Sequence, residues 1–438
     1  MRPVEARQQP RDGRPAESGF TLIELLVVML VTVLLVLVLL QLFDGMSRMA
    51  RVQSHLADLQ QQQRVAQREL ASVLRMVGRG GLTGEPVTAA GSDRSVRRLT
   101  ALEVRNNVGQ GSNPPAEPVI GGSATAIVGS DVLIVRGVFT TPVYQVNYVD
   151  PDAFIQGVNQ VRLTDTTPTG VPQDLEPLRQ AIAAARAEPL IFTDALGDAY
   201  GVAELVPALS ASTADTVTLA FRTTGSANAD LFSSLSTGGG FPDFRKVLTV
   251  GILEEYRYYV TEGPVGRQLE CARVYPGTET VHDLGTIDRL VARDIFDLQV
   301  ALGFDSHQGG GFLTCDDDVA GVDDDIVEVA GGGADDWLFN GAGVSGAGED
   351  ASQAPWTEPS GGWSTGGSCG DTVQPRLYYV RLSTLALSPR PDPYHEADPL
   401  ASLEDRVYGS AADDPLNGTT ARRFRRRVLQ TTIDLRNL

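Results

Sequence analysis

The chain has 438 residues, enough for two or three average domains or one elaborated domain, and its contents of hydrophobic (42%) and charged (21%) residues are ordinary for a folded protein. A net charge of −19 argues against general binding of nucleic acid or of anionic lipid by the folded body, because both ligands require positive charge. The 46 glycines and 25 prolines point to a body rich in strands and loops.

An apolar run of membrane length begins near the N-terminus. From Leu22 to Leu40 the only polar side chains are Glu24 and Thr32. At about 1.5 Å per helical residue the run measures roughly 28 Å, which is enough to cross the hydrocarbon core of a bilayer. A secretory signal peptide would show small residues at a cleavage site after its apolar run. Here the run passes into Gln41-Leu42-Phe43-Asp44, and a plain signal anchor is the other simple alternative.

Glu24 is a costly residue inside such a run, and it stands close behind Gly19-Phe20. This segment resembles the N-terminus of type IV prepilins. In that family a hydrophilic leader ends in Gly, a dedicated peptidase cuts after it, and the new N-terminal residue, usually Phe, is N-methylated. Gly19 and Phe20 match the cleavage site, and Glu24 matches the acidic fifth residue of the mature protein. The resemblance implies that Glu24 pairs with the Phe20 amine of a neighbouring subunit and fixes the register of assembly.

The predicted leader, residues 1–19, carries a small excess of arginine over carboxylates. This excess favours a cytoplasmic N-terminus and an exported body. The helix is expected to span 20–78, with 20–43 in the membrane or in the core of a filament. Beyond the membrane run, apolar residues recur at spacings of three and four up to Val77, with Gln63 in the single gap, and glycines follow from Gly78. This second half is predicted to pack on the body.

The body, 79–438, reads as short strands separated by turns rich in Gly, Pro and Asp. One surface helix is predicted over 175–188, and a Gly/Asp-rich loop over about 305–370. The clearest predicted strands are 131–136, 216–221, 246–250, 254–260, 296–302 and 377–383.

Several body segments resemble the PilW group of minor pilins and occur in the same order along the chain. The stretch from about 140 to 245 has no such match and is interpreted as an insertion. The resemblance implies an α+β, pilin-like fold, in which the long N-terminal helix packs on a body of antiparallel sheets with large loop insertions. The matching segments are Ser130–Arg136, Asp294–Val300, Asp335–Trp337, Tyr379–Ser383 and Arg425–Asn437.

The three cysteines allow one disulfide in an exported body and leave one thiol over. Cys315 and Cys369 lie in loop-like sequence and are the favoured pair, whereas Cys271 lies in a strand-like run and is expected to be buried and free. Three free thiols are the alternative.

An acidic cluster follows Cys315 directly. Carboxylates this close together can supply the oxygen ligands that calcium prefers, and Asp316, Asp318, Asp323 and Asp325 are the expected ligands. The spacing departs from an EF-hand loop, because Ala320 stands at position five and Glu328 falls one residue late. A solvated acidic loop is the alternative interpretation.

A basic run near the C-terminus could indicate nucleic acid, but we favour a terminal strand whose arginines pair with the acidic body. The run consists of Arg422, Arg423, Arg425, Arg426 and Arg427.

No pattern of an enzyme stands out. The segment Gly341–Gly346 fits G-x-G-x-x-G but neither follows a strand nor opens a helix, and the single lysine, Lys246, is not in a phosphate-binding loop. None of the four histidines has metal-ligand or triad-like spacing. We therefore expect no enzymatic activity.

The sequence is interpreted as a minor type IV pilin of the PilW kind. The resemblance implies a single-pass protein of the bacterial inner membrane with its body in the periplasm, which moves to the cell-surface pilus and primes assembly at its tip. The implied partners are the prepilin peptidase, the inner-membrane assembly platform, other minor pilins and the major pilin through the helix, and a pilus-tip adhesin. The alternatives are a minor pseudopilin of a type II secretion system, which is usually much smaller, and an adhesin or DNA-binding module displayed at the tip.

Overall fold

The structure is a computed structural model, and the chain divides into two compact units, Met1–Ala57 and Asp58–Leu438. The residues that the structure describes are 21–82, 100–109, 119–121, 124–147, 149–150, 153–155, 159–194, 200–222, 247–264, 266–276, 288–305, 337–339, 376–404, 406–409 and 415–435.

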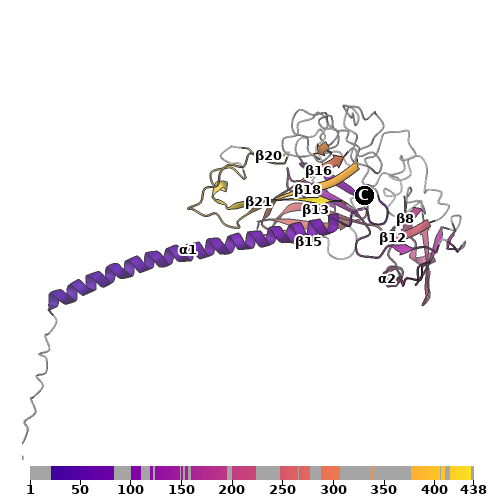
Figure 1. Ribbon diagram of the computed structural model, residues 1–438, viewed down its shortest axis with the longest axis horizontal. Coiled ribbons are helices and arrows are strands. Elements are labelled where there is room, and N and C mark those ends of the chain that lie inside the picture. The colour runs from indigo at the N-terminus through magenta and orange to yellow at the C-terminus, as the bar shows by residue number, and fades with distance from the viewer. Residues whose placement is uncertain are drawn as a thin grey trace, which may run out of the picture. The chain divides into compact units, whose positions relative to one another are not determined.

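Helix α1 runs without a break from Leu22 to Leu74 (Figure 1). It contains no proline, and its single glycine, Gly45, does not interrupt it. Up to Met49 its apolar side chains are exposed, whereas from Leu59 onward it buries a stripe on the body. The buried residues of the stripe are Leu59, Gln63, Ala66, Leu70, Val73 and Leu74. Their spacing of three and four residues places them on one helix face.

Two antiparallel sheets pack on this second half of α1. The first has the strand order β1-β4-β13-β14-β15. Its strands are β1 (Leu102–Arg105), β4 (Val132–Gly137), β13 (Glu254–Gly263), β14 (Gly266–Val274) and β15 (Asp288–Arg293). The second has the order β17-β16-β18-β21. Its strands are β16 (Ile295–Asp305), β17 (Trp337–Phe339), β18 (Arg376–Leu387) and β21 (Arg426–Asp434).

Short polar contacts join the two sheets beside β4 and β16. The Asp131 amide donates to the Leu298 carbonyl oxygen at 2.9 Å, and the Asp131 carboxylate accepts the Val300 amide at 2.7 Å. Asp131 and Ser130 are both fully buried. The segment just before β4 therefore holds β16 by backbone and side chain together.

Glutamine side chains fix α1 against the edges of these sheets. The Gln63 amide nitrogen donates to the carbonyl oxygens of Thr384 on β18 and Arg427 on β21, at 3.2 and 2.8 Å. Gln67 donates to the Leu429 carbonyl oxygen, and Gln62 accepts the Arg293 amide of β15. Gln63, which interrupts the apolar stripe in the sequence, is thus a buried polar group with backbone partners.

A third, larger antiparallel sheet has the order β5-β12-β8-β9-β11-β7-β6, with β10 paired to β11. All of its strands except β12 fall within the predicted insertion, 140–245. They are β5 (Tyr144–Gln145), β6 (Phe154–Ile155), β7 (Gln160–Thr164), β8 (Pro189–Asp194), β9 (Tyr200–Leu205), β10 (Ala211–Ser212), β11 (Thr216–Arg222) and β12 (Val247–Ile252). The 3₁₀ helix η3 (Pro207–Leu209) lies between β9 and β10.

Helix α2 (Glu176–Ala183) begins with Glu176-Pro177 in its first turn and buries Leu178 and Ala181. The predicted helix over 175–188 was too long. Ala185 adopts a left-handed φ of 53°, which ends the helix, and β8 already begins at Pro189. The six predicted strands all correspond to observed ones, with ends that differ by a few residues.

The chain leaves α1 through glycines at left-handed φ, 102° for Gly80 and 100° for Gly81. A Cβ on Gly81 would come within 2.0 Å of Thr193 on β8, and one on Gly80 within 2.7 Å of Val138. A residue with a Cβ would therefore clash with the Val138 or Thr193 side chain and would be strained at this backbone conformation. These two glycines therefore allow the chain, just after the end of α1, to pass close to Val138 and to strand β8 of the third sheet.

The remaining described elements are small. They comprise the hairpins β2 (Val119–Gly121) with β3 (Ala124–Thr125) and β19 (Ser402–Leu403) with β20 (Arg406–Val407), and the 3₁₀ helix η4 (Ala421–Arg423).

Replacing Gln63 with leucine would complete the apolar stripe but remove a donor from two buried carbonyl oxygens. We expect Gln63→Leu to lower the free energy of unfolding by about 1–3 kcal/mol, because two hydrogen bonds are lost and each contributes about 0.5–1.5 kcal/mol. Denaturant unfolding of the detergent-solubilised chain measures it. Gln61→Leu, at an exposed position of the same helix, is the matched control and should be near neutral. Equal stability of Gln63→Leu and wild type would contradict the role of this amide.

Candidate functional site: the N-terminal helix

The helix begins with a reciprocal cap. The Thr21 amide and hydroxyl both donate to the Glu24 carboxylate at 3.0 Å, and the Glu24 amide donates to the Thr21 hydroxyl oxygen at 3.3 Å. This is the capping-box arrangement of Thr-x-x-Glu, in which two otherwise unpaired amides of the first turn are satisfied. Sequence reasoning singled out Glu24 but missed Thr21, although the T-x-x-E spacing is a recognised signal for a helix start.

The residues that follow the cap form an apolar, solvent-exposed surface. An 18-residue window of α1 reaches a mean hydropathy of 3.2, and none of that window is buried in the protein. Leu22 is 83% exposed and Phe43 is 72% exposed. The one hydroxyl within the run, on Thr32, donates to the Val28 carbonyl oxygen at 2.7 Å and so needs no other partner. By length and composition this helix can cross a membrane, and its surface can equally be covered by other apolar helices.

The other residues predicted as functional lie mostly outside the described residues. These include the cleavage and methylation site Gly19-Phe20, the calcium ligands Asp316, Asp318, Asp323 and Asp325, and the disulfide pair Cys315 and Cys369. The calcium site and the disulfide stay predictions. In the described part of the chain, no group of three or more His, Cys, Asp or Glu side chains is arranged to hold a metal ion.

Cys271 lies on β14 and is a free, buried thiol. Burial raises its pKa to about 11. It therefore stays protonated at neutral pH and is a poor nucleophile.

The basic run near the C-terminus divides among different partners. Arg422 pairs with Glu396 at 3.1 Å and Arg425 with Asp392 at 2.8 Å. Arg426 donates to the backbone oxygen of Asp398. The prediction of one strand with pairing arginines was thus partly wrong, because Arg422 and Arg423 lie in η4 and only Arg426 and Arg427 lie in β21.

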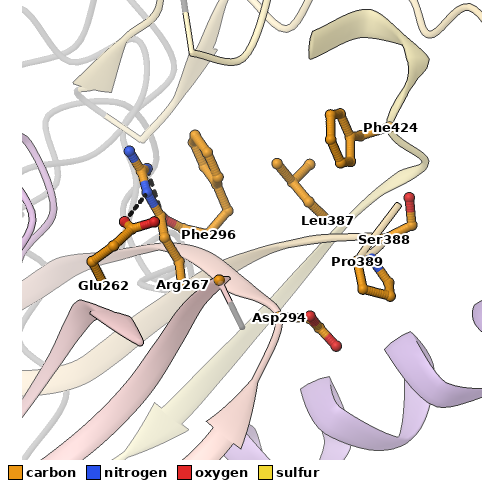
Figure 2. Close-up of a pocket in the computed structure, with 9 residues that line it drawn as sticks. Glu262, Arg267, Asp294, Phe296, Leu387, Ser388, Pro389 and Phe424 are labelled. Carbon is orange, nitrogen blue, oxygen red and sulfur yellow. Dashed lines mark hydrogen bonds and ion pairs between the residues drawn. The ribbon is translucent and has the colours of Figure 1, made fainter. Parts of the chain in front are cut away.

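A shallow pocket of about 290 Å³ lies beside the β13–β14 hairpin (Figure 2). Its polar side holds Arg267, which lies 3.4 Å from Glu262 and stacks 3.9 Å above the Phe296 ring. Leu387 and Phe424 line the other side. Arg267 is thus occupied by contacts that join β14 to β16, and the lining presents no nucleophile with an adjacent base. We interpret the pocket as a junction between sheets.

Comparison with known proteins places the N-terminal segment. Residues 14–40 match the family model of the prokaryotic N-terminal methylation motif. The N-terminal segment therefore carries the methylation motif of type IV prepilins. The matched residues include Gly19, Phe20, Thr21 and Glu24, so the capped helix start falls inside the motif.

Other comparisons add less. A type IV-like pilin from Thermus thermophilus, TTHA1219, aligns over 60% of this chain and 96% of its own, at 11% sequence identity and a TM-score of 0.17. A TM-score this low establishes no shared fold for the body. No curated protein matches the chain significantly.

Removing the Thr21 hydroxyl should loosen the first turn of α1. We expect Thr21→Val to cost about 1 kcal/mol locally, the usual value of an N-cap side chain, and to speed amide exchange at Glu24 and Leu25 several-fold, since these amides bond to Thr21. Hydrogen exchange of the chain in detergent micelles measures it, with Thr21→Ser as the control that keeps the hydroxyl. Unchanged exchange in Thr21→Val would show that the cap does not hold the helix start.

Proposed function

We propose that the chain is a minor type IV pilin, cut after Gly19 and methylated on Phe20. Residues 20–43 hold it in the bacterial inner membrane with its body in the periplasm, and the same helix then packs among the helices of a pilus. Its place is the tip, where it primes assembly with other minor pilins. Prepilin peptidase and the inner-membrane assembly platform act on it before assembly. The body serves a structural role without catalysis.

The observation that carries this proposal is the exposed apolar helix with its capped, acidic start. A helix this hydrophobic is unstable in water over the length from Leu22 to Phe43, because every exposed apolar side chain favours transfer out of water. The methylation motif ends at residue 40, within the same apolar surface. Membrane insertion and helix–helix packing both remove this surface from water, and a pilin does each in turn.

Glu24 has two roles to separate. Its carboxylate caps the helix through Thr21, and we propose that in the filament its charge also faces the methylated Phe20 amine of a neighbouring subunit. An uncompensated carboxylate among apolar helices is costly, so this pairing admits only one axial register. The cap and the charge respond differently to substitution, because glutamine can replace glutamate in a capping box but carries no charge.

Processing is the first test. Membrane-extracted protein should begin at Phe20 with one added methyl group, and intact-mass and N-terminal peptide analysis read this directly. Gly19→Asp should leave the leader attached, while Ser18→Ala, next to the cleavage point, should be cut normally. A mature N-terminus beyond residue 40 would rule out the pilin assignment.

Assembly is the second test. We expect Glu24→Gln to be inserted and cleaved but recovered in sheared filaments at least about tenfold less than wild type, because a buried charge loses its partner. Thr21→Val, which keeps the charge and loses the cap hydroxyl, should be incorporated much better than Glu24→Gln. Quantitative immunoblots of filament and membrane fractions measure both. Normal incorporation of Glu24→Gln would leave capping as the whole role of this residue. Recovery with secretion filaments instead of pili would assign the chain to a type II system.

A further inference from the structure

Strand β21 is the last strand of its sheet, and its outer edge is open. β21 pairs with β18 from Leu387↔Arg426 to Tyr379↔Asp434 and has no strand on its other side in the described part of the chain. It is nine residues long and contains neither proline nor glycine. Such a regular edge is a template for another strand, and proteins usually shorten, bend or cover it.

The pairing pattern shows which backbone groups face outward. The Ser388 amide donates to the Arg425 carbonyl oxygen just beyond the strand ends. In an antiparallel pair hydrogen-bonded positions alternate, so Arg427, Leu429, Thr431 and Ile433 direct their amides and carbonyls toward β18. Those of the alternating residues between them point away from it.

The outward-facing positions are exposed. Val428, Gln430, Thr432 and Asp434 all have exposed side chains, and Val428 is 40% exposed. No described residue bonds to their outward amides or carbonyls. Helix α1 does not cover this edge, since Gln63 and Gln67 bond to the carbonyls of Arg427 and Leu429, which belong to the inward set.

The positive charge of the arginines along the outer edge of β21 favours pairing with an acidic strand. Arg427 lies in β21 and Arg423 lies shortly before it, and among the described residues neither has a carboxylate partner, although the chain as a whole carries −19. Opposite charges facing each other across a strand pair are stabilising, and like charges are destabilising. A strand with an acidic residue opposite Arg427 and a β-branched residue opposite Val428 matches the edge.

A second copy of this chain is the less suitable occupant. Antiparallel self-pairing centred on Gln430 would set Arg426 opposite Asp434, which is favourable in charge. However, α1 runs in the same direction as β21, since Gln63 contacts Arg427 and Gln67 contacts Leu429 and Thr431. Self-pairing would therefore point the N-terminal ends of the two Asp58–Leu74 segments in opposite directions. Neighbouring pilins anchored in one membrane must point them the same way.

We propose that the outer edge of β21 is a docking site for an acidic extended strand of another protein, which adds to the sheet beside Val428–Thr432. Backbone hydrogen bonds supply the affinity, and Arg427 with Val428 supplies the selectivity, as in other cases of strand addition. The second-copy argument rests on the proposed function, but the open edge and its charge do not.

Two labelled nine-residue peptides of alternating valine and threonine test the proposal on the full chain in detergent micelles. One carries a glutamate placed to lie opposite Arg427, and the other a lysine. Fluorescence anisotropy should show the glutamate peptide binding about 2- to 30-fold more tightly, and Arg427→Gln should remove most of that difference. Bound peptide should slow amide exchange at Val428, Gln430 and Thr432.

Thr432→Pro is the blocking variant, because it removes an outward amide and leaves the β18 ladder intact. It should weaken peptide binding at least tenfold, whereas Thr432→Ala should bind as wild type, with melting temperatures checked for both. Equal binding of the two peptides, no binding at millimolar concentration, or full binding to Thr432→Pro would overturn the proposal. A dimer of the chain that Thr432→Pro dissociates would also overturn it, in favour of self-pairing. Processing and incorporation at the N-terminus are measured separately, so the two proposals can fail independently.

Discussion

The packing of the Asp58–Leu74 segment of α1 on two sheets at once is the contact on which the rest of the body depends. Leu59, Ala66 and Leu70 supply the apolar contact, and each is essentially removed from solvent. The glutamines add hydrogen bonds to backbone groups of β15, β18 and β21, beyond those that the strands make with one another. Because one helix face serves both sheets, neither can shift along the helix without losing hydrogen bonds as well as buried area.

An ionic contact adds to the packing of α1 on the first sheet. Glu69 of α1 pairs with Arg289 on β15 and accepts a hydrogen bond from Tyr258 on β13 at 3.4 Å. Arg289 is more than half exposed, so the pair adds little stability by itself. Its contribution is to fix the rotation of the helix about its axis, because only one face presents Glu69 to β15.

The opposite face of the first sheet is held together by buried charge. Arg136 on β4 contacts Glu255 at 2.5 Å and Glu103 at 2.6 Å, and Arg257 contacts Glu255 at 2.7 Å. Burial alone would lower the pKa of Arg136, but the two carboxylates more than offset it and leave the pKa raised. Such a network gives little net stability over an apolar core, yet removal of one member leaves an unpaired buried charge. It therefore constrains which strands lie next to each other more than it stabilises them.

The sequence by itself determined the parts of the protein that depend on local pattern. Hydropathy defined the apolar span, the Gly-Phe step and Glu24 indicated a prepilin start, and β-branched runs located the principal strands, because burial and backbone preference act residue by residue. Only the tertiary structure decided which strands share a sheet. It decided that 144–222 joins β12 in a sheet of its own, that Gln63 belongs in the core, and that β21 keeps a free edge. Those features depend on contacts between residues far apart in the chain, such as the hydrogen bond from the Gln63 side chain to the Thr384 carbonyl oxygen 321 residues away. No local sequence pattern specifies such a contact.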